Sequence, residues 1–167
     1  MQLAGGGGPL ADELADLRRR GLIRRAVLYL DCGNAEAVAT AALASPLVDG
    51  VTCYWNAVQR DCTPAAWDRL AAGRVPVLAL RTLGGGTADT AVARLMAEAG
   101  CADAVELAFR LVAGEPMIRS SIGGTADPAH LERFLQAAAA ATPLPAALHR
   151  AWDLALRGAA GASRSGS

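Results

Sequence analysis

The chain is 167 residues long, and its 16 cationic and 16 acidic side chains give a formal net charge of zero. This balance excludes the strongly basic surface with which proteins bind nucleic-acid backbones or anionic membranes. No segment approaches the ~20 consecutive apolar residues of a membrane-spanning helix. We therefore expect a soluble, cytoplasmic protein that binds neither nucleic acid nor membranes.

The cysteine, histidine and lysine contents limit the chemistry that the chain can perform. Four cysteines stand far apart without a CxxC pair, and there are only two histidines, so the sequence predicts neither a metal site nor a disulfide framework. All 16 cationic side chains are arginine. A mechanism that requires a lysine amine is therefore excluded within this chain.

Apolar spacing predicts helices and strands that alternate along the chain. In order, we expect a helix over 10–20, a strand over 23–30, a helix over 35–44, a strand over 51–55, a helix from Pro64 to Gly73, a strand over 75–80, a helix ending at Gly100, a helix over 102–113, a strand over 117–122, a helix from Pro128 and a helix over 145–156. Such alternation is typical of an α/β fold with four parallel strands, because each crossover helix packs on the sheet.

Capping residues fix where two of these helices begin. Thr63 before Pro64, and Asp127 before Pro128, combine an N-cap side chain with proline at the first helical position. We expect the second of these helices to bury Leu131, Phe134 and Leu135, which recur at helical spacing. The string Gly-Gly-Thr-Ala-Asp occurs at 85–89 and again at 123–127, which indicates two similar loops between a strand and a helix.

Four segments, in the right order, resemble the aldo/keto reductase family. They correspond to the fifth to eighth strand regions of that family's barrel: Gly21-Leu22-Ile23-Arg24, Val51 to Asn56 with Arg60, Val75 to Gly86, and Ser121 to Thr125 with His130 to Glu132. The resemblance implies a partial TIM (β/α)8 barrel, the C-terminal half without the N-terminal catalytic half. The length agrees, since whole barrels typically need ~250 residues. We expect one half-barrel domain over 10–157, a flexible N-terminus over 1–9 and a disordered tail over 158–167.

The resemblance also implies a cofactor, NADPH, over the C-terminal ends of the strands, where barrel loops build active sites. By carry-over, Trp55 stands where an aromatic ring stacks on the nicotinamide. A buried tryptophan at a strand end would explain the residue equally well. The remaining predicted cofactor-binding residues lie in two loops: Arg81, Leu83, Gly84, Gly124 and Thr125.

Two interpretations of these loops are possible, an anion-binding site or ordinary turns and helix caps. Glycines allow the backbone to approach an anion closely, and a helix N-terminus favours negative charge. The plainer alternatives are a glycine hinge between strand and helix at Gly84, and an ordinary N-cap at Asp127.

Other positions depart from the family. Leu30 and Asp31 stand in place of its Ser-Asn pair, Thr52 in place of a Gln, and Phe134 in place of an Asn near the adenine. Asp127 stands near the position of the 2′-phosphate, which a carboxylate would repel.

The family's reaction needs a tyrosine tuned by a lysine, together with an aspartate and a histidine, and these belong to its N-terminal half. Here the tyrosines are Tyr29 and Tyr54, and there is no lysine. His130 and His149 lie on predicted helices and are expected to be surface or packing residues. We therefore predict no catalytic residue in this chain.

Three functions from different classes follow. The first is an aldo/keto reductase-like, NADP-dependent oxidoreductase domain, truncated and inactive alone. Its open sheet edges would be covered by a second copy of the chain or by a complementary N-terminal half. The alternative is a non-catalytic α/β module that binds a nucleotide or a phosphometabolite, and a pure interaction protein is a further possibility.

Overall fold

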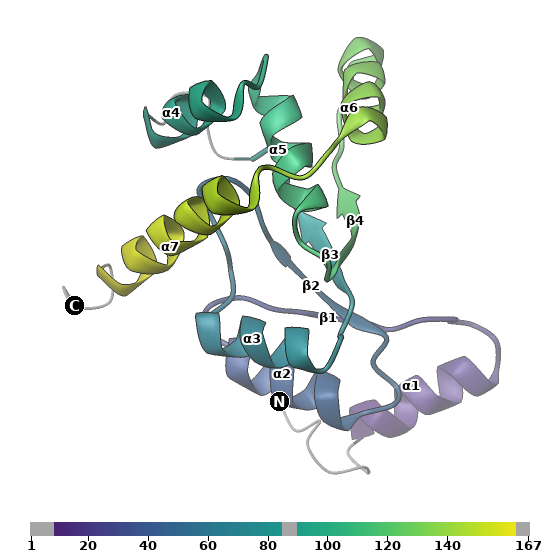
Figure 1. The fold of residues 1–167 in the computed structure, drawn as a ribbon. Coiled ribbons are helices and arrows are strands. Elements are labelled where there is room, and N and C mark those ends of the chain that lie inside the picture. Colours follow the sequence, from purple (N-terminus) through teal and green to yellow (C-terminus); the bar gives the residue numbers. More distant parts are fainter. Residues whose placement is uncertain (1–8, 85–89, 163–167) are drawn as a thin grey trace. The chain divides into compact units, whose positions relative to one another are not determined.

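The computed structural model describes residues 9–84 and 90–162. In chain order the elements are α1 (Pro9–Arg19), β1 (Val27–Tyr29), α2 (Ala35–Ala44), β2 (Gly50–Tyr54), α3 (Pro64–Ala72), β3 (Val77–Leu80), α4 (Thr90–Ala99), α5 (Ala104–Ala113), β4 (Ile118–Ile122), α6 (Pro128–Ala140) and α7 (Ala146–Ala162), as Figure 1 shows. Each predicted helix and strand is present. None of the described helices combines the length and hydropathy needed to cross a membrane.

The four strands form one sheet in the order β1-β2-β3-β4, which is also their order along the chain. Strands β1 and β2 run parallel, with Val27 opposite Gly50 and Tyr29 opposite Thr52. The predicted α/β class, with four parallel strands that alternate with helices, is confirmed.

The chain divides into two compact units. The first contains the described residues up to Cys53 together with Asp61–Leu78, and the second contains Tyr54–Arg60 together with the described residues from Ala79 onward. Strands β2 and β3 therefore contribute residues to both units. The single domain expected over 10–157 stays a prediction.

In the first unit, α2 packs against α3 and on β1. Its core is formed by apolar side chains from these elements and from β2: Leu28, Val38, Ala39, Val51, Ala66, Trp67 and Leu70. The opposite side of β1 is open, because side chains alternate along a strand and Val27 and Tyr29 are 43% and 44% exposed.

Local polar contacts explain why α3 begins where the sequence predicts. The hydroxyl oxygen of Thr63 accepts a hydrogen bond from the backbone N–H of Ala66 at 3.1 Å, and Pro64 follows as the first helical residue. The same hydroxyl donates to Glu36 of α2 at 2.6 Å, and Arg69 bonds to that carboxylate at 3.2 Å. The hydrogen bond from Thr63, more than the guanidinium of Arg69, holds the pKa of Glu36 below its usual value. The cap therefore also ties α3 to α2.

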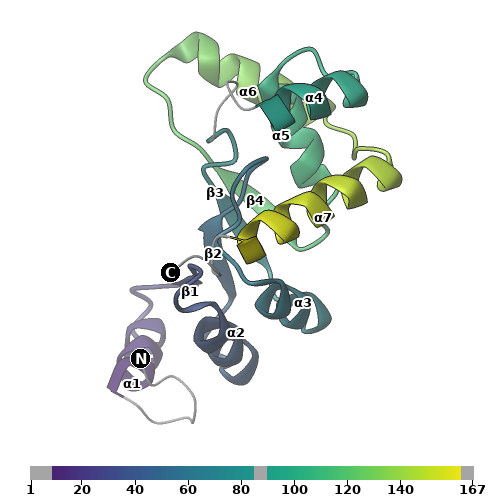
Figure 2. The same cartoon turned by 90° about the vertical axis from the view of Figure 1, so that its left-hand side faces the viewer.

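In the second unit, α5 is the central helix and packs against α4, α6 and β4 (Figure 2). Its buried side chains are Leu107, Ala108 and Leu111, and α4 contributes Val92 and Leu95 to the same unit. Val92 and Leu95, like Leu107 and Leu111, stand three or four residues apart, which places each pair on one face of its helix.

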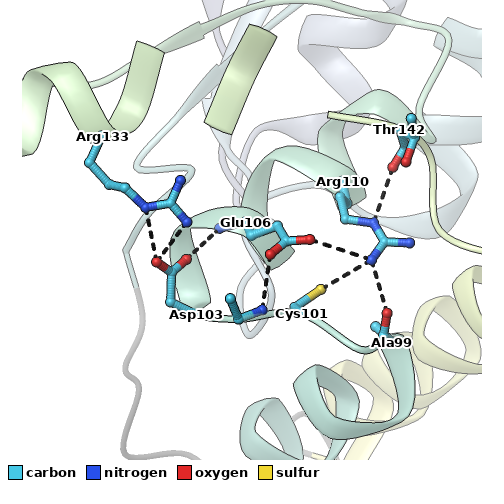
Figure 3. A network of polar contacts seen from close by, with 8 residues as sticks. Ala99, Cys101, Asp103, Glu106, Arg110, Arg133 and Thr142 are labelled. Carbon is cyan, nitrogen blue, oxygen red and sulfur yellow. Dashed lines mark hydrogen bonds and ion pairs between the residues drawn. The ribbon is translucent and has the colours of Figure 1, made fainter. Parts of the chain in front are cut away.

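A polar network holds the helices of this unit together (Figure 3). Arg110 of α5 donates to the carbonyl of Ala99 at 2.9 Å, to the carbonyl of Thr142 at 3.3 Å and to the Cys101 sulfur at 3.5 Å. Asp103, the N-cap of α5, also accepts two hydrogen bonds from Arg133 of α6, at 2.7 and 3.0 Å. The network therefore fixes α6 relative to α5.

The same network shifts two pKa values. Burial alone would raise the pKa of the Asp103 carboxyl, but hydrogen bonds from the backbone N–H of Glu106 and from Arg133 outweigh it and hold that pKa below its usual value. Burial raises the pKa of the Cys101 thiol, despite the nearby guanidinium of Arg110. Asp103 is therefore ionised and Cys101 is protonated at neutral pH.

The structure differs from the sequence predictions at three places. Strand β1 covers only Val27–Tyr29 of the strand predicted over 23–30. Leu131 and Leu135 are 52% and 62% exposed and Phe134 is half-buried, so the prediction that these three are buried is wrong; α6 instead buries Ala137. Helix α7 continues to Ala162, past its predicted end and into the segment that we assigned to the tail. The first Gly-Gly-Thr-Ala-Asp string, at 85–89, lies outside the described residues.

Candidate functional site: a cavity beyond the ends of β3 and β4

The second unit contains a cavity of about 480 Å³ where β3 and β4 end. It is lined by residues from the loop after β3, from the end of β4 and its following loop, and from α5 and α6: Arg81, Thr82, Leu83, Gly84, Phe109, Ser121, Ile122, Gly123, Gly124, Thr125, Leu131, Phe134, Leu135 and Ala138. In parallel α/β folds, ligands bind at this end of the strands. The cavity is therefore the candidate functional site.

A tight turn after β3 shapes one part of the cavity. Arg81 has a positive φ of 52°, and the backbone N–H of Gly84 donates to the carbonyl of Arg81 at 2.6 Å. A Cβ atom at Gly84 would lie 2.9 Å from that carbonyl oxygen, so only glycine fits without movement of the backbone. Asn56, which is buried, donates its side-chain N–H to the same carbonyl at 3.2 Å. Two hydrogen bonds to the Arg81 carbonyl, one from the Gly84 backbone and one from the Asn56 side chain, therefore hold the turn.

The cation of the cavity is Arg81. Its guanidinium carbon lies 5.1 Å from the ring centroid of Tyr54, a cation–π distance. Among the described residues that line the cavity, Arg81 carries the one positive charge, and its side chain is exposed. This arrangement presents a guanidinium, which suits bidentate binding of phosphate oxygens, at the edge of a partly apolar cavity.

Two lining hydroxyl groups are buried without a partner. The Oγ1 atom of Thr82 and the Oγ atom of Ser121 make no hydrogen bond to any residue that the structure describes, and Thr82 is only 4% exposed. Buried hydroxyl groups without partners cost stability, so native proteins rarely leave them in that state. A polar ligand in the cavity would provide the missing hydrogen bonds.

The loop after β4 leaves open space for a ligand. A Cβ atom at Gly123 or Gly124 would meet nothing within 4 Å, so these glycines are not required by crowding from the protein. Thr125 accepts a hydrogen bond from the backbone N–H of Asp127 at 3.1 Å, and Asp127 in turn accepts one from Ala129 at 2.9 Å. Asp127 is therefore the N-cap of α6, as the plainer interpretation of this residue predicted.

Apolar side chains complete the lining. Leu131, Phe134 and Leu135 of α6 are the residues that were expected in the core, and the structure places them at the cavity instead. Phe109 of α5 also lines it. An apolar helix face that stays open to solvent beside a cation is the composition of a small-molecule site rather than of a packed core.

The structure brings five of the six predicted cofactor-binding residues to this one cavity: Arg81, Leu83, Gly84, Gly124 and Thr125. Trp55, the sixth, does not line it. Sequence reasoning missed Phe109 and Ser121. Ser121 could have been found from its position at a strand end.

Trp55 lies in a separate buried cluster of the second unit. Its side chain is 0% exposed and meets Trp152 of α7 edge-on, with ring centroids 5.4 Å apart. The guanidinium of Arg60 lies 5.2 Å from the Trp55 ring and 4.4 Å from the Trp152 ring. The prediction that Trp55 stacks on a nicotinamide stays a prediction, and this burial favours the alternative of a core tryptophan.

Charged groups surround the cluster. Arg60 forms ion pairs with Asp153 and, at 3.2 Å, with Glu115. His149 packs edge-on against Trp152, with centroids 5.2 Å apart. Burial, followed by the nearby positive charge of Arg60, lowers the pKa of His149, although a hydrogen bond with Leu111 opposes the shift. His149 is therefore a neutral packing residue, and His130 is exposed on α6.

Three of the residues that depart from the family, Leu30, Asp31 and Thr52, have structural roles in the first unit. Leu30 is fully buried. The Asp31 carboxylate accepts hydrogen bonds from the backbone N–H groups of Gly33 and Asn34, at 2.7 and 3.0 Å. Thr52 donates its hydroxyl to the carbonyl of Leu78 at 2.9 Å. These contacts explain the side chains without a ligand.

Comparison with known proteins supports the predicted fold. The chain is similar to aldo-keto reductase AKR11C1 from Bacillus halodurans, in its holo and apo forms, with a TM-score of 0.63 for each and identities of 16% and 15%. The likeness covers 89% and 90% of this chain but only 57% and 58% of the reductase. No family model matches the sequence, and no curated protein matches it. An aldo/keto reductase-like fold is thereby confirmed, in a chain that spans little more than half of that reductase.

Proposed function

We propose that the chain is an aldo/keto reductase-like domain that binds a nicotinamide adenine dinucleotide, NADPH by resemblance, and that it performs no reduction alone. The observation that supports this proposal most strongly is the cavity, to which five of the predicted cofactor-binding residues contribute at the ends of β3 and β4. The similarity to a reductase whose structure is known in a holo form agrees with it.

The residues of the cavity fit the phosphate part of such a cofactor. Arg81 would neutralise phosphate charge, and Thr82 and Ser121 have hydroxyl groups without partners among the described residues. The space beside Gly123 and Gly124 would allow phosphate oxygens to approach the backbone. When bound, the cofactor would supply a hydride; the residues of this chain would bind and orient it.

The chain alone lacks a proton donor of the family's kind. Reduction of a carbonyl needs an acid that protonates the oxygen, and the family tunes a tyrosine for this role with a lysine. The sequence contains no lysine. Tyr54 lies under the guanidinium of Arg81 in a cation–π contact, which gives its ring a structural role. Reduction would therefore require residues from outside this chain.

The open side of β1 supports the expectation of a partner. Val27 and Tyr29 are exposed on one side of the strand, while Leu28 between them is buried on the other. Among the residues that the structure describes, β1 is an edge strand, and an edge strand with an exposed apolar side favours association. We therefore propose that a second copy of the chain, or a complementary segment of the barrel, covers this side.

Calorimetric titration with NADPH tests the binding proposal. We expect saturable binding that Arg81→Gln weakens about 10- to 100-fold, the range of about 1.5–3 kcal/mol for a hydrogen bond to a charged group. Arg74→Gln is a matched control, because Arg74 is also exposed and also has a positive φ, of 55°, but does not line the cavity. Absence of binding by the folded chain would contradict the proposal.

The non-catalytic module remains the second candidate, and the burial of Trp55 favours it. A domain that contacts only the phosphates and the adenosine would bind ADP as tightly as NADPH. A domain that also holds the nicotinamide end would bind NADPH more tightly than ADP. The same titration, repeated with ADP, therefore distinguishes the two functions.

A further inference from the structure

The polar and apolar groups of the cavity come from different elements. Among the described residues, every polar side chain in the lining lies after β3, at the end of β4 or in the loop after β4, namely Arg81, Thr82, Ser121 and Thr125. The side chains that α5 and α6 contribute are all apolar: Phe109, Leu131, Phe134, Leu135 and Ala138. This composition suits an anion with a large apolar or flat body.

Building on the proposed function, we propose that the cavity binds nucleoside diphosphates through the diphosphate and contacts the base only through apolar side chains, so that it does not distinguish one purine from another. Adenine and guanine have similar flat faces and differ in the polar groups at their edges. Strong discrimination between them requires hydrogen-bonding groups at those edges, because a hydrophobic surface separates such ligands only weakly.

The polar side chains of α6 that lie near this surface are already engaged. Arg133 is bound to Asp103 by two hydrogen bonds, and Gln136 donates to Glu132 at 3.3 Å. The ring of His130 stacks on Phe134, with centroids 6.4 Å apart, and does not line the cavity. None of these side chains therefore faces a base in the cavity as it stands.

The solvent exposure of the apolar side of the cavity also argues against discrimination between adenine and guanine. Leu131 and Leu135 are 52% and 62% exposed, so the edge of a base that lies against them would remain in contact with water. A base edge that stays hydrated is not desolvated on binding. Desolvation of a base edge without new hydrogen bonds is the other way in which a site rejects the wrong base. Adenine and guanine would then bind with similar free energies.

The test is calorimetric titration of the folded chain with ADP, GDP and inorganic pyrophosphate. We expect dissociation constants for ADP and GDP within about threefold of each other, and weaker binding of pyrophosphate, because the base adds apolar contact. Binding of ADP that is more than about 30-fold tighter than that of GDP would overturn this inference but leave the proposed function standing. Failure of all three to bind to a chain that binds NADPH would overturn this inference alone, whereas failure of NADPH to bind as well would overturn both.

Two variants test whether the base of the nucleotide lies against α6. Leu135→Asn should weaken the binding of ADP and of GDP by the same factor and leave the binding of pyrophosphate unchanged. Arg81→Gln should weaken the binding of all three ligands. Leu154→Asn is the matched control, because Leu154 is 68% exposed on α7 and does not line the cavity. If Leu135→Asn leaves ADP binding unchanged while Arg81→Gln weakens it, the base does not lie against α6 and the inference is wrong.

Discussion

Trp152 lies edge-on against Trp55, with ring centroids 5.4 Å apart, and donates its indole N–H to the carbonyl of Ala57 at 2.9 Å. Arg60 packs its guanidinium against both rings and pairs with Asp153 on the same helix. Helix α7 is thereby fixed on the segment that follows β2. In the second unit, the Trp152 ring of α7 and the Arg60 guanidinium thus both lie against the Trp55 ring.

This contact predicts a large loss of stability when the Trp152 ring is removed. Trp152→Ala should lower the free energy of unfolding by about 3–5 kcal/mol, because it leaves a cavity beside Trp55 and Arg60. Trp152→Phe keeps a ring but loses the hydrogen bond to Ala57, so it should cost less. Urea denaturation followed by circular dichroism measures both. A Trp152→Ala variant as stable as the unmodified chain would show that α7 is not anchored in this way.

The stability should also depend on pH through His149. Since burial lowers its pKa, the fold favours the neutral imidazole, and the unfolded chain takes up a proton at a higher pH than the folded chain does. This contribution is fully present above the ordinary histidine pKa of about 6.5 and is lost as the pH falls below it. The groups that face His149 are Arg60, Glu115, Asp153 and the Trp152 ring.

We therefore expect the thermal unfolding midpoint to decrease as the pH is lowered from 7.5 to 5.5. The decrease should be smaller in a His149→Gln variant. His130→Gln is the matched control, because the side chain of His130 is 67% exposed. Equal pH dependence in His149→Gln and His130→Gln would contradict this interpretation.

Gly84 should be far less tolerant of substitution than Gly123. Gly84→Ala would place its Cβ 2.9 Å from the carbonyl oxygen of Arg81, a backbone atom that cannot move without opening the turn. Overpacking of this kind costs about 1–3 kcal/mol. Gly123→Ala meets nothing within 4 Å and should leave stability unchanged. Thermal denaturation of the two variants compares them directly, and equal midpoints would show that the turn is not as tight as described.

Self-association should depend on the open side of β1. We expect light scattering to find the chain at more than its monomer mass at micromolar concentration, and Tyr29→Glu to shift it toward monomer by placing charge on that side. Leu154→Glu, which adds the same charge at an exposed position of α7, should have no such effect. A stable monomer of the unmodified chain would count against the proposed partner.

Much of the fold could be predicted from the sequence because its signals are local. Thr63 with Pro64, and Asp127 with Pro128, mark helix starts that the structure reproduces as side-chain caps. Gly100, with a φ of 63°, ends α4 as expected. Such signals depend on a few neighbouring residues, so they do not require knowledge of the tertiary structure.

The candidate site could be predicted only in part. Gly84 and Gly124 could be predicted as site residues because glycine-containing loops are recognisable in the sequence. The apolar spacing of Leu131 and Leu135 predicted burial, since periodicity shows which side of a helix is apolar but not whether another element covers it. The burial of Trp55 likewise depends on Trp152, which lies far along the chain.

The most direct test of the central claim is an amide chemical-shift titration of the folded chain with NADPH. The proposed function predicts saturable shifts of the backbone signals of Gly84, Gly124 and Thr125, with none at Gly33 or Gly50 in the first unit. Shifts confined to the first unit, or no shifts at millimolar NADPH, would contradict the claim that this cavity binds the cofactor.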